Sequence, residues 1–156
     1  MLLLKVIIFA LVAPGTFVVL IPYLLLALYA DAHPHSSRQL GYLGVLPMAL
    51  GAVVYIRCLW DFAVTGRGTP ALIDPPKNLV VCGLYCYVRN PMYIGSVMVL
   101  LGEAIWFQSP ILFGYSAAVF VALYLLVLLY EEPTLLRLFG DSYRQYCRSV
   151  PRWIPR

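Results

Sequence analysis

The chain has 156 residues, of which 62% are apolar and only 12% are charged, and its mean hydropathy is +0.85. A typical soluble domain is about 45–50% apolar and about 25% charged, so this composition excludes a water-soluble globule and indicates a membrane domain. The formal charge of +4 is too small to indicate a nucleic-acid partner. The four cysteines form no Cys-x-x-Cys pair and lack nearby histidines, which argues against a metal site or a disulfide framework.

Four apolar stretches along the chain predict four transmembrane helices. One helical crossing needs about 20 apolar residues, and helices are expected because lipid gives the backbone no hydrogen-bond partners. The expected spans are approximately Leu2–Ala30, Leu40–Phe62, Tyr93–Phe107 and Ile111–Tyr130. The first span is too long for the apolar core of a cleavable signal, so we expect it to be retained. The fold class is therefore predicted to be an all-α, polytopic membrane protein.

Prolines and glycines predict how these spans bend and pack. Pro14 and Pro22 are expected to bend or break the first span. The second span carries Gly41, Gly44 and Gly51, small residues that allow another helix to approach closely. Only residues 108–110 separate spans three and four, which predicts a tight helical hairpin.

The connection from about Ala63 to Asn90 is the first candidate for a functional segment, because long loops inside a compact domain are usually functional or disordered. Apolar and polar residues alternate along it, which is typical of an ordered segment. We expect one membrane domain over residues 1–156. Residues 1–63 would form the two N-terminal spans, and residues 64–156 would carry the loop, the hairpin and the tail.

The tail from Glu131 to Val150 predicts an amphipathic helix. Apolar and aromatic side chains recur at helical spacing, namely Leu135, Phe139, Tyr143, Tyr146, Cys147 and Val150. Such a helix could lie on the membrane surface, or it could cover a site as a lid. Periodicity alone does not choose between these two interpretations.

The basic residues predict the orientation in the membrane. With four spans, all of the 11 Lys and Arg residues except Arg38 fall on or near one side. The positive-inside rule places that side, with both termini, the long loop and the tail, in the cytoplasm. His33 and His35 then lie in the short outer loop, where we expect them to be solvated.

The segment from Lys77 to Gly95 combines basic and aromatic residues with an Arg-Asn-Pro break directly before the third span. Pro91 suits the first turn of a helix, and Asn90 is predicted to be its N-cap. A helix start of this kind offers free N–H groups to an anion or a carboxylate. Arg89 is explained either as part of such a site or as a cytoplasmic anchor of the span.

Three carboxylates lie in or beside the apolar stretches. Glu131 and Glu132 follow the fourth span, where they are either solvated or one of them accepts hydrogen bonds from a ligand ammonium or from ribose hydroxyls. Glu103 lies about ten residues inside the third span. It is either a structural group, protonated or paired with Arg57 or a tyrosine, or a substrate contact.

Three pieces of the sequence together resemble the isoprenylcysteine carboxyl methyltransferase and phospholipid methyltransferase superfamily. They are the loop Gly83-Leu-Tyr-x-Tyr-Val-Arg-Asn-Pro-Met-Tyr-Ile-Gly95, the hairpin with Ser109-Pro110, and the tail from Glu131-Glu132 through Phe139-Gly140-Asp-Ser-Tyr143 to Val150-Pro151-Arg152. The resemblance covers roughly Pro70 to Pro155. The order and spacing of the pieces around a two-helix hairpin make the combination specific.

The resemblance implies an integral membrane enzyme that binds S-adenosylmethionine on the cytoplasmic side and methylates a lipophilic acceptor, with membrane lipids as surroundings and without metal or nucleic acid. It implies cofactor contacts from the loop, the helix start and an acidic residue after the hairpin, here Lys77, Asn78, Leu79, Val80, Tyr85, Asn90, Pro91, Met92, Tyr93 and Glu131. Arg89, Tyr93 and Glu131 are the candidates for catalytic residues. The sequence leaves the methyl acceptor and the oligomeric state open.

Two departures from the family pattern bear on the chemistry. Many members have Arg-His-Pro where this chain has Arg89-Asn90-Pro91, and asparagine does not titrate near neutral pH, so no histidine base is expected. The prenylcysteine enzymes are expected to carry an arginine shortly before the acidic run, whereas residues 127–130 contain no basic residue. Thiol, amine and carboxylate acceptors therefore all stay open.

Two other classes of function compete with methyl transfer. Four helices and the intramembrane carboxylate Glu103 are compatible with a small multispan transporter. Membrane helices with an amphipathic tail are also compatible with a scaffold that catalyses nothing. A test of cofactor binding would distinguish a methyltransferase from a transporter and from a scaffold.

Overall fold

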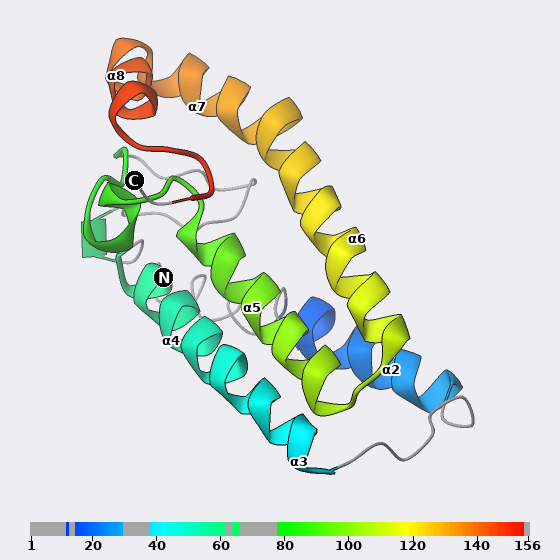
Figure 1. Cartoon of the computed structure of the whole chain (residues 1–156). Helices are drawn as coiled ribbons and strands as arrows, with labels where there is room; N and C mark the ends of the chain where they lie inside the picture. Colours follow the sequence, from blue (N-terminus) through cyan, green and yellow to red (C-terminus); the bar gives the residue numbers. More distant parts are fainter. Residues whose placement is uncertain (1–11, 13–14, 30–37, 62–63, 66–77, 155–156) are drawn as a thin grey trace.

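A computed structural model of the chain describes residues 12, 15–29, 38–61, 64–65 and 78–154. These residues form helices and no strand, which confirms the all-helical prediction over this part of the chain (Figure 1). In chain order the elements are the π-helix η1 (Gly15–Leu20), α2 (Ile21–Leu28), α3 (Arg38–Gly41), the short 3₁₀ helix η3 (Tyr42–Gly44), α4 (Val45–Asp61), the 3₁₀ helix η5 (Gly83–Cys86), α5 (Pro91–Trp106), α6 (Pro110–Leu126), the π-helix η6 (Val127–Glu131), α7 (Glu132–Phe139) and α8 (Asp141–Ser149).

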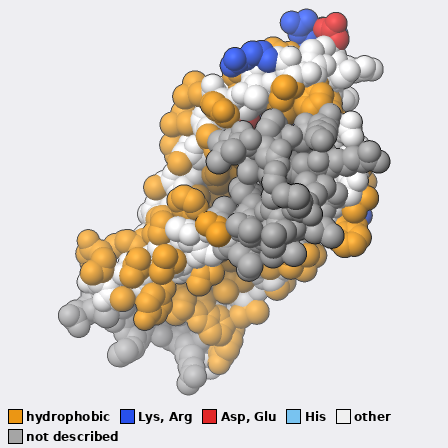
Figure 2. Space-filling model, turned by 180° about the vertical axis from the view of Figure 1, so that it is seen from behind, with side chains coloured by type: hydrophobic (Ala, Val, Ile, Leu, Met, Phe, Trp, Pro, Cys, Tyr) orange, Lys and Arg blue, Asp and Glu red, His pale blue; other side chains and the backbone are white. Residues whose placement is uncertain are grey.

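Two continuous helices are long and apolar enough to cross a membrane, Gln39–Asp61 with 23 residues and Pro110–Phe139 with 30 residues. Gly15–Leu28 and Pro91–Trp106 are shorter apolar helices. Many apolar side chains on the long helices face outward, and Leu46, Val53 and Ile56 are each about two thirds exposed. Figure 2 shows hydrophobic side chains along the helices and charged ones gathered mainly at the end where α7 and α8 lie. Such an apolar surface suits lipid rather than water.

Paired glycines bring α4 and α5 into backbone contact. A Cβ atom on Gly51 would lie 2.5 Å from the carbonyl oxygen of Gly95, and one on Gly95 would lie 2.8 Å from the carbonyl oxygen of Gly51. A Cβ atom on Gly102 would likewise lie 2.6 Å from the carbonyl oxygen of Gly44. These contacts confirm that the second-span glycines serve close helix packing.

The predicted hairpin joins α5 to α6 (Figure 1). Phe107 N–H bonds to the carbonyl of Glu103 at 2.9 Å, and Ser109 N–H bonds to the carbonyl of Ala104 at 3.1 Å. Gln108 reverses the chain with a left-handed φ of 49°, and α6 then begins at Pro110. Because α5 and α6 are antiparallel neighbours, the start of α5 lies beside the end of the α6–η6 helix.

The first described helix is not broken at Pro22, so of the expected bend or break the break is wrong there. The helix runs without interruption from Gly15 to Leu28, and Pro22 falls in the first turn of α2, directly after π-helical η1. Pro133 likewise falls in the first turn of α7, directly after π-helical η6. The wider π turn gives room where proline lacks an N–H and its ring crowds the preceding turn. Pro14 lies outside the described residues.

The end of the fourth span and the tail differ from the prediction. The helix that begins at Pro110 does not end near Tyr130 but continues to Phe139. The single amphipathic helix expected from Glu131 to Val150 is divided at Gly140, whose positive φ of 53° interrupts the helix and lets α8 begin in a new direction. The tail is therefore the last two turns of one long helix followed by the separate helix α8.

The apolar side of α8 packs on the protein. Tyr143, Tyr146 and Val150 form a buried cluster, against which Leu79, Leu135, Phe139 and Cys147 pack. Tyr146 also donates a hydrogen bond of 2.7 Å to the carbonyl of Tyr85 in η5. Burial raises the pKa of Tyr146, so its hydroxyl stays protonated at neutral pH and keeps this bond. Helix α8 thus packs against the segment before α5.

Candidate functional site

The candidate site lies where α5 begins and η6 ends. The hydroxyl of Tyr93, in the first turn of α5, donates a hydrogen bond to the carboxylate of Glu131, the last residue of η6. Both side chains are partly buried. The two residues are 38 positions apart in the sequence, so this bond is a tertiary contact that joins the two ends of the hairpin.

The neighbouring carboxylate, Glu132, is held by two arginines. Its two oxygens accept hydrogen bonds of 2.7 Å each from Nε and Nη2 of Arg152, and Oε1 also accepts one of 2.9 Å from Nη1 of Arg89. These hydrogen bonds raise the pKa of Arg152 and favour its charged form. The acidic pair is therefore not solvated, and its two members have different partners.

Main-chain bonds fasten the C-terminal segment over the start of α5. Arg89 N–H bonds to the carbonyl of Pro151 at 2.9 Å, and the side-chain amide of Asn90 donates to the carbonyl of Arg152 at 3.2 Å. Asn90 occupies the N-cap position of α5, but its side chain makes no capping hydrogen bond. The predicted N-cap position of Asn90 is therefore confirmed, while its side-chain amide is hydrogen-bonded to the C-terminal segment.

The other predicted cofactor contacts mostly build the core beneath the site. Val80, Tyr85 and Met92 are buried in a cluster with Cys58, and Leu79 packs against the α8 cluster. Asn78 donates a long hydrogen bond of 3.5 Å to the carbonyl of Thr65, and Pro91 is buried at the first position of α5. Lys77 lies outside the described residues. Among the predicted contacts that the structure describes, the side chains of Tyr93 and Glu131 are joined by a direct hydrogen bond.

Arg89 contacts protein groups rather than open surroundings. Its Nη1 donates to Glu132 and, at 2.9 Å, to the sulfur of Cys147 on α8, and its side chain is only 13% exposed. Arg89 thereby joins the loop to α7 and α8.

Asp61, which the sequence did not single out, ends α4 beneath the loop. The residue is 5% exposed, and Oδ1 lies 3.7 Å from Nη2 of Arg57. Gly83 has a φ of +58° and lies against this carboxylate, so any side chain at position 83 would collide with it. An aspartate at the end of an apolar stretch, followed by a glycine in the loop, was the available sequence signal.

Glu103 lies apart from the candidate site. Ten residues of helix separate it from Tyr93, which is about 15 Å at 1.5 Å per residue. Oε2 of Glu103 is buried without a hydrogen-bond partner among the described residues. Arg57, one of the two partners considered for Glu103, pairs with Asp61 instead.

A group of three aromatic side chains joins the C-terminal segment to α6. The ring of Trp153 lies 5.3 Å from that of Phe120 in an edge-to-face arrangement and 6.2 Å from that of Tyr124 in a stacked one, measured between centroids. The indole nitrogen of Trp153 is buried and has no hydrogen-bond partner in the described part of the chain. The sequence analysis did not identify this group.

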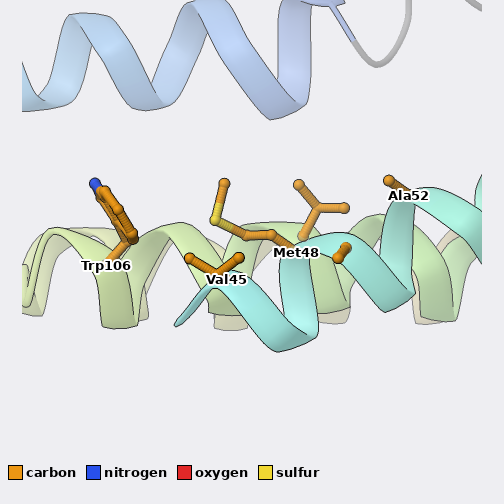
Figure 3. Close-up of a pocket in the computed structure, with 6 residues that line it drawn as sticks. Val45, Met48, Ala52 and Trp106 are labelled. Atoms are coloured by element: carbon orange, nitrogen blue, oxygen red, sulfur yellow. The ribbon is translucent and has the colours of Figure 1, made fainter. Parts of the chain in front are cut away.

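An apolar pocket of about 400 Å³ lies on the α4–α5 pair, away from Tyr93 and Glu131. It is lined by Val45, Met48, Ala49, Ala52, Val99 and Trp106. Figure 3 shows Met48 and Trp106 pointing to the same side of these helices. Its apolar lining offers volume for a hydrocarbon chain but no group that could carry chemistry.

All four cysteines are free, with Cys58 buried and Cys86 exposed. Within residues 12, 15–29, 38–61, 64–65 and 78–154, no three His, Cys, Asp or Glu side chains gather into a group that could hold a metal ion.

Comparison with known proteins identifies the family. The described residues form apolar helices, two of which are long enough to cross a membrane, with a polar cluster at one end of a hairpin, as is typical of helical membrane proteins. The sequence profile of the phospholipid methyltransferase family matches residues 40–142. Because this match covers more than half of the chain, the protein belongs to the phospholipid methyltransferase family, as the resemblance predicted.

Individual relatives are methyltransferases with different named substrates. The chain is 39% identical to the protein-S-isoprenylcysteine O-methyltransferase of Schizosaccharomyces pombe over 80 residues, which is 49% of this chain and 33% of that protein. It is 36% identical to methanethiol S-methyltransferase 1 of Bradyrhizobium diazoefficiens over 72 residues, 46% of this chain and 24% of that protein. With the human isoprenylcysteine enzyme it shares 28% identity over 125 residues, 76% of this chain and 43% of that protein. The chain thus spans less than half the length of the curated relatives that it matches.

Proposed function

We propose that this protein transfers a methyl group from S-adenosylmethionine to a lipophilic acceptor, and that it binds this cofactor between the start of α5 and the end of η6. The observation that carries the proposal is the hydrogen bond from Tyr93 to Glu131. It joins the helix start and the acidic residue to which the family resemblance assigns cofactor contacts. The named activities of the relatives support the same reaction class.

The residues present fit the polar groups of this cofactor. The Glu131 carboxylate, oriented by Tyr93, suits an ammonium group or ribose hydroxyls. Because the Asn90 side chain turns to Arg152 instead of capping α5, the N–H groups of Met92 and Tyr93 are left to bind a carboxylate. We propose that Lys77, Asn78, Leu79, Val80 and Tyr85 form the adjoining wall, with Pro91 starting the helix.

The chemistry of methyl transfer sets what the protein has to do. When bound, S-adenosylmethionine supplies a methyl group whose bond to a positively charged sulfur breaks as the lone pair of the acceptor attacks. The protein must then hold the acceptor in line and exclude water. The Arg89–Glu132–Arg152 cluster serves this by fastening the C-terminal segment over the site, which makes Arg89 a positioning residue rather than a catalytic one.

We further propose that all four apolar helices, beginning with the one that includes Gly15–Leu28, cross the membrane in a single domain over residues 1–156. The α5 helix has 16 residues and spans about 24 Å, which is close to the hydrocarbon thickness of about 30 Å. The charged groups of the candidate site lie at the end of the helices that carries the loop and the tail. The positive-inside rule supports a cytoplasmic position for that end and for both termini.

Thermal stability in detergent tests cofactor binding. A ligand that binds only the folded protein stabilises it by about 2.7 kcal/mol at a concentration of 100 times its Kd. For a chain of this size we expect 1 mM S-adenosylmethionine, or its demethylated product, to raise the Tm by roughly 5–10 °C. Adenosine alone, which lacks the amino-acid part, serves as the control and should give a smaller shift. No shift at millimolar cofactor contradicts the proposal.

A transporter that uses Glu103 is the second candidate, favoured by the buried, unpaired Oε2 of that residue. Reconstituted vesicles distinguish the two functions. Under the methyltransferase proposal, Glu103→Gln leaves the cofactor-induced Tm shift unchanged. A solute or proton flux that depends on Glu103, without any cofactor-induced shift, would favour the transporter.

A further inference from the structure

The C-terminal segment places Trp153 beside the candidate site. Its neighbour Arg152 is fixed twice, through its guanidinium to Glu132 and through its carbonyl to the side chain of Asn90. Glu132 adjoins Glu131, and Asn90 directly precedes α5. Trp153 therefore directly follows a residue that is fastened to both sides of the proposed cofactor site.

The indole of Trp153 lies deeper along the hairpin than Glu131. It packs against Phe120 and Tyr124 of α6, and Tyr124 precedes Glu131 by seven residues, which is about 10 Å along a helix. Phe120 and Tyr124 are 39% and 36% exposed, so the aromatic group opens toward the surroundings of α6. An apolar molecule arriving from lipid would meet these rings before it reached the polar site.

The N–H group of this indole is a donor without an acceptor. Nε1 is buried and makes no hydrogen bond with any described residue. Buried donors are nearly always paired, and an unpaired one is costly unless water or a ligand satisfies it. The edge-to-face contact with Phe120 supplies at most a weak N–H to ring interaction. The two neighbouring rings are partly exposed, so a molecule bound against them would lie close to this donor.

We propose that the Trp153 indole N–H donates a hydrogen bond to an oxygen of the methyl acceptor, while Phe120 and Tyr124 pack against its apolar part. This inference rests on the proposed methyl transfer and narrows its substrate class. The acceptor is an amphiphile that carries a carboxylate, carbonyl or phosphodiester oxygen next to an apolar chain. A simple thiol does not fit, because its sulfur is only a weak hydrogen-bond acceptor.

Trp153→Phe tests the proposal, because phenylalanine keeps an aromatic ring and removes the donor. Methyl transfer by the full chain in detergent is measured with labelled S-adenosylmethionine and three acceptors: an S-prenylated cysteine with a free carboxylate, phosphatidylethanolamine and a long-chain alkanethiol. For an oxygen-bearing acceptor that the wild type methylates, we expect the variant to raise the KM about tenfold and to leave kcat unchanged. A tenfold loss of affinity is the size expected when one hydrogen bond is lost. Trp60→Phe, at a tryptophan of α4 that is 63% exposed, is the matched control.

Comparing the three methyl acceptors shows which kind of oxygen accepts the hydrogen bond from Trp153. A KM increase confined to the prenylated cysteine assigns the carboxylate, one confined to phosphatidylethanolamine assigns the phosphodiester, and either supports the inference. If the alkanethiol is the preferred acceptor, or if Trp153→Phe changes no KM, the inference is overturned while methyl transfer stands. If no acceptor is methylated and the cofactor causes no Tm shift, the proposed function itself has failed.

Nitrogen-15 NMR measures the proposed hydrogen bond in the wild-type protein itself, with Trp153→Phe used only to assign the indole resonance. The chain has three tryptophans and therefore three indole N–H resonances. A saturating oxygen-bearing acceptor should shift one resonance downfield, and that resonance should be the one missing from Trp153→Phe spectra. A Trp153 resonance that stays in place with every acceptor shows that the N–H faces only the Phe120 ring and overturns the inference.

Discussion

At the scale of single residues, the two adjacent glutamates show how neighbours in a helix acquire different roles. Successive helical residues point about 100° apart, so Glu131 faces Tyr93 on α5 whereas Glu132 faces the arginines of the loop and the C-terminal segment. The sequence could show that both carboxylates needed partners at the end of an apolar helix. It could not show which partner each would take, because those partners lie between 20 and 43 positions away.

The negative charge of Glu131 is expected to contribute to cofactor binding. Glu131→Gln removes the negative charge but keeps an oxygen that can accept from Tyr93, so the fold should persist. We expect the affinity for S-adenosylmethionine to fall at least tenfold, because a charge-assisted hydrogen bond to the cofactor is lost. Titration calorimetry in detergent measures this, with Glu103→Gln as the matched control on the same hairpin. Equal affinities in the wild type and both variants would remove Glu131 from the site.

At the scale of elements, the close approach of another helix to the second span was predicted best and the helix ends least well. Small residues in the second span indicated close approach, and Gly44 and Gly51 do meet Gly102 and Gly95 backbone to backbone. Proline rules predicted a bend or a break of the first span, whereas the helix continues through Pro22 after a π-helical segment. The periodicity of apolar residues predicted one amphipathic helix that continues through Gly140, whereas the backbone conformation of Gly140 divides the tail into two helices. Such adjustments depend on local geometry that hydropathy does not encode.

The close contact of Gly51 with α5 is expected to be important for stability. Gly51→Leu should lower the Tm by roughly 3–10 °C, because a side chain there collides with the Gly95 carbonyl and overpacking typically costs about 1–3 kcal/mol. Gly114→Leu is the matched control, since the space around a Cβ atom on Gly114 in α6 is open. Thermal unfolding in detergent, followed by circular dichroism, measures both variants. Similar Tm values for the two leucine variants would show that the α4–α5 contact does not limit stability.

At the scale of the whole molecule, the sequence predicted which segments form the polar end but not how they connect. The positions of Arg89, Glu131 and Glu132 relative to the apolar stretches placed them together by topology alone. The bonds that fasten Asn90 to Arg152 and Tyr85 to Tyr146 join positions 62 and 61 residues apart, and no local pattern reports such pairs. Trp153 was missed for the same reason, since its aromatic partners belong to α6.

The proposed membrane orientation can be tested by labelling cysteines at the two ends of the α4–α5 pair. Cys86 is exposed in η5 beside the candidate site, whereas Arg38 begins α3 at the opposite end of the α4–α5 pair (Figure 1). We expect a membrane-impermeant maleimide to spare Cys86 in intact cells and to label it in inverted vesicles, because the basic end should face the cytoplasm. A background with serine at positions 82 and 147 isolates this signal, since Cys58 is fully buried.

The complementary variant makes the experiment decisive. In a background that also carries Cys86→Ser, Arg38→Cys should be labelled in intact cells, since α3 and the polar end lie on opposite sides of the membrane if the helices cross it. Labelling of both positions from the same side would mean that α4 and α5 do not span the bilayer, despite the length of Gln39–Asp61. Labelling of Cys86 in intact cells together with protection of position 38 would invert the orientation. The proposed site would then face away from the compartment in which cells make S-adenosylmethionine, and methyl transfer there would lack its donor.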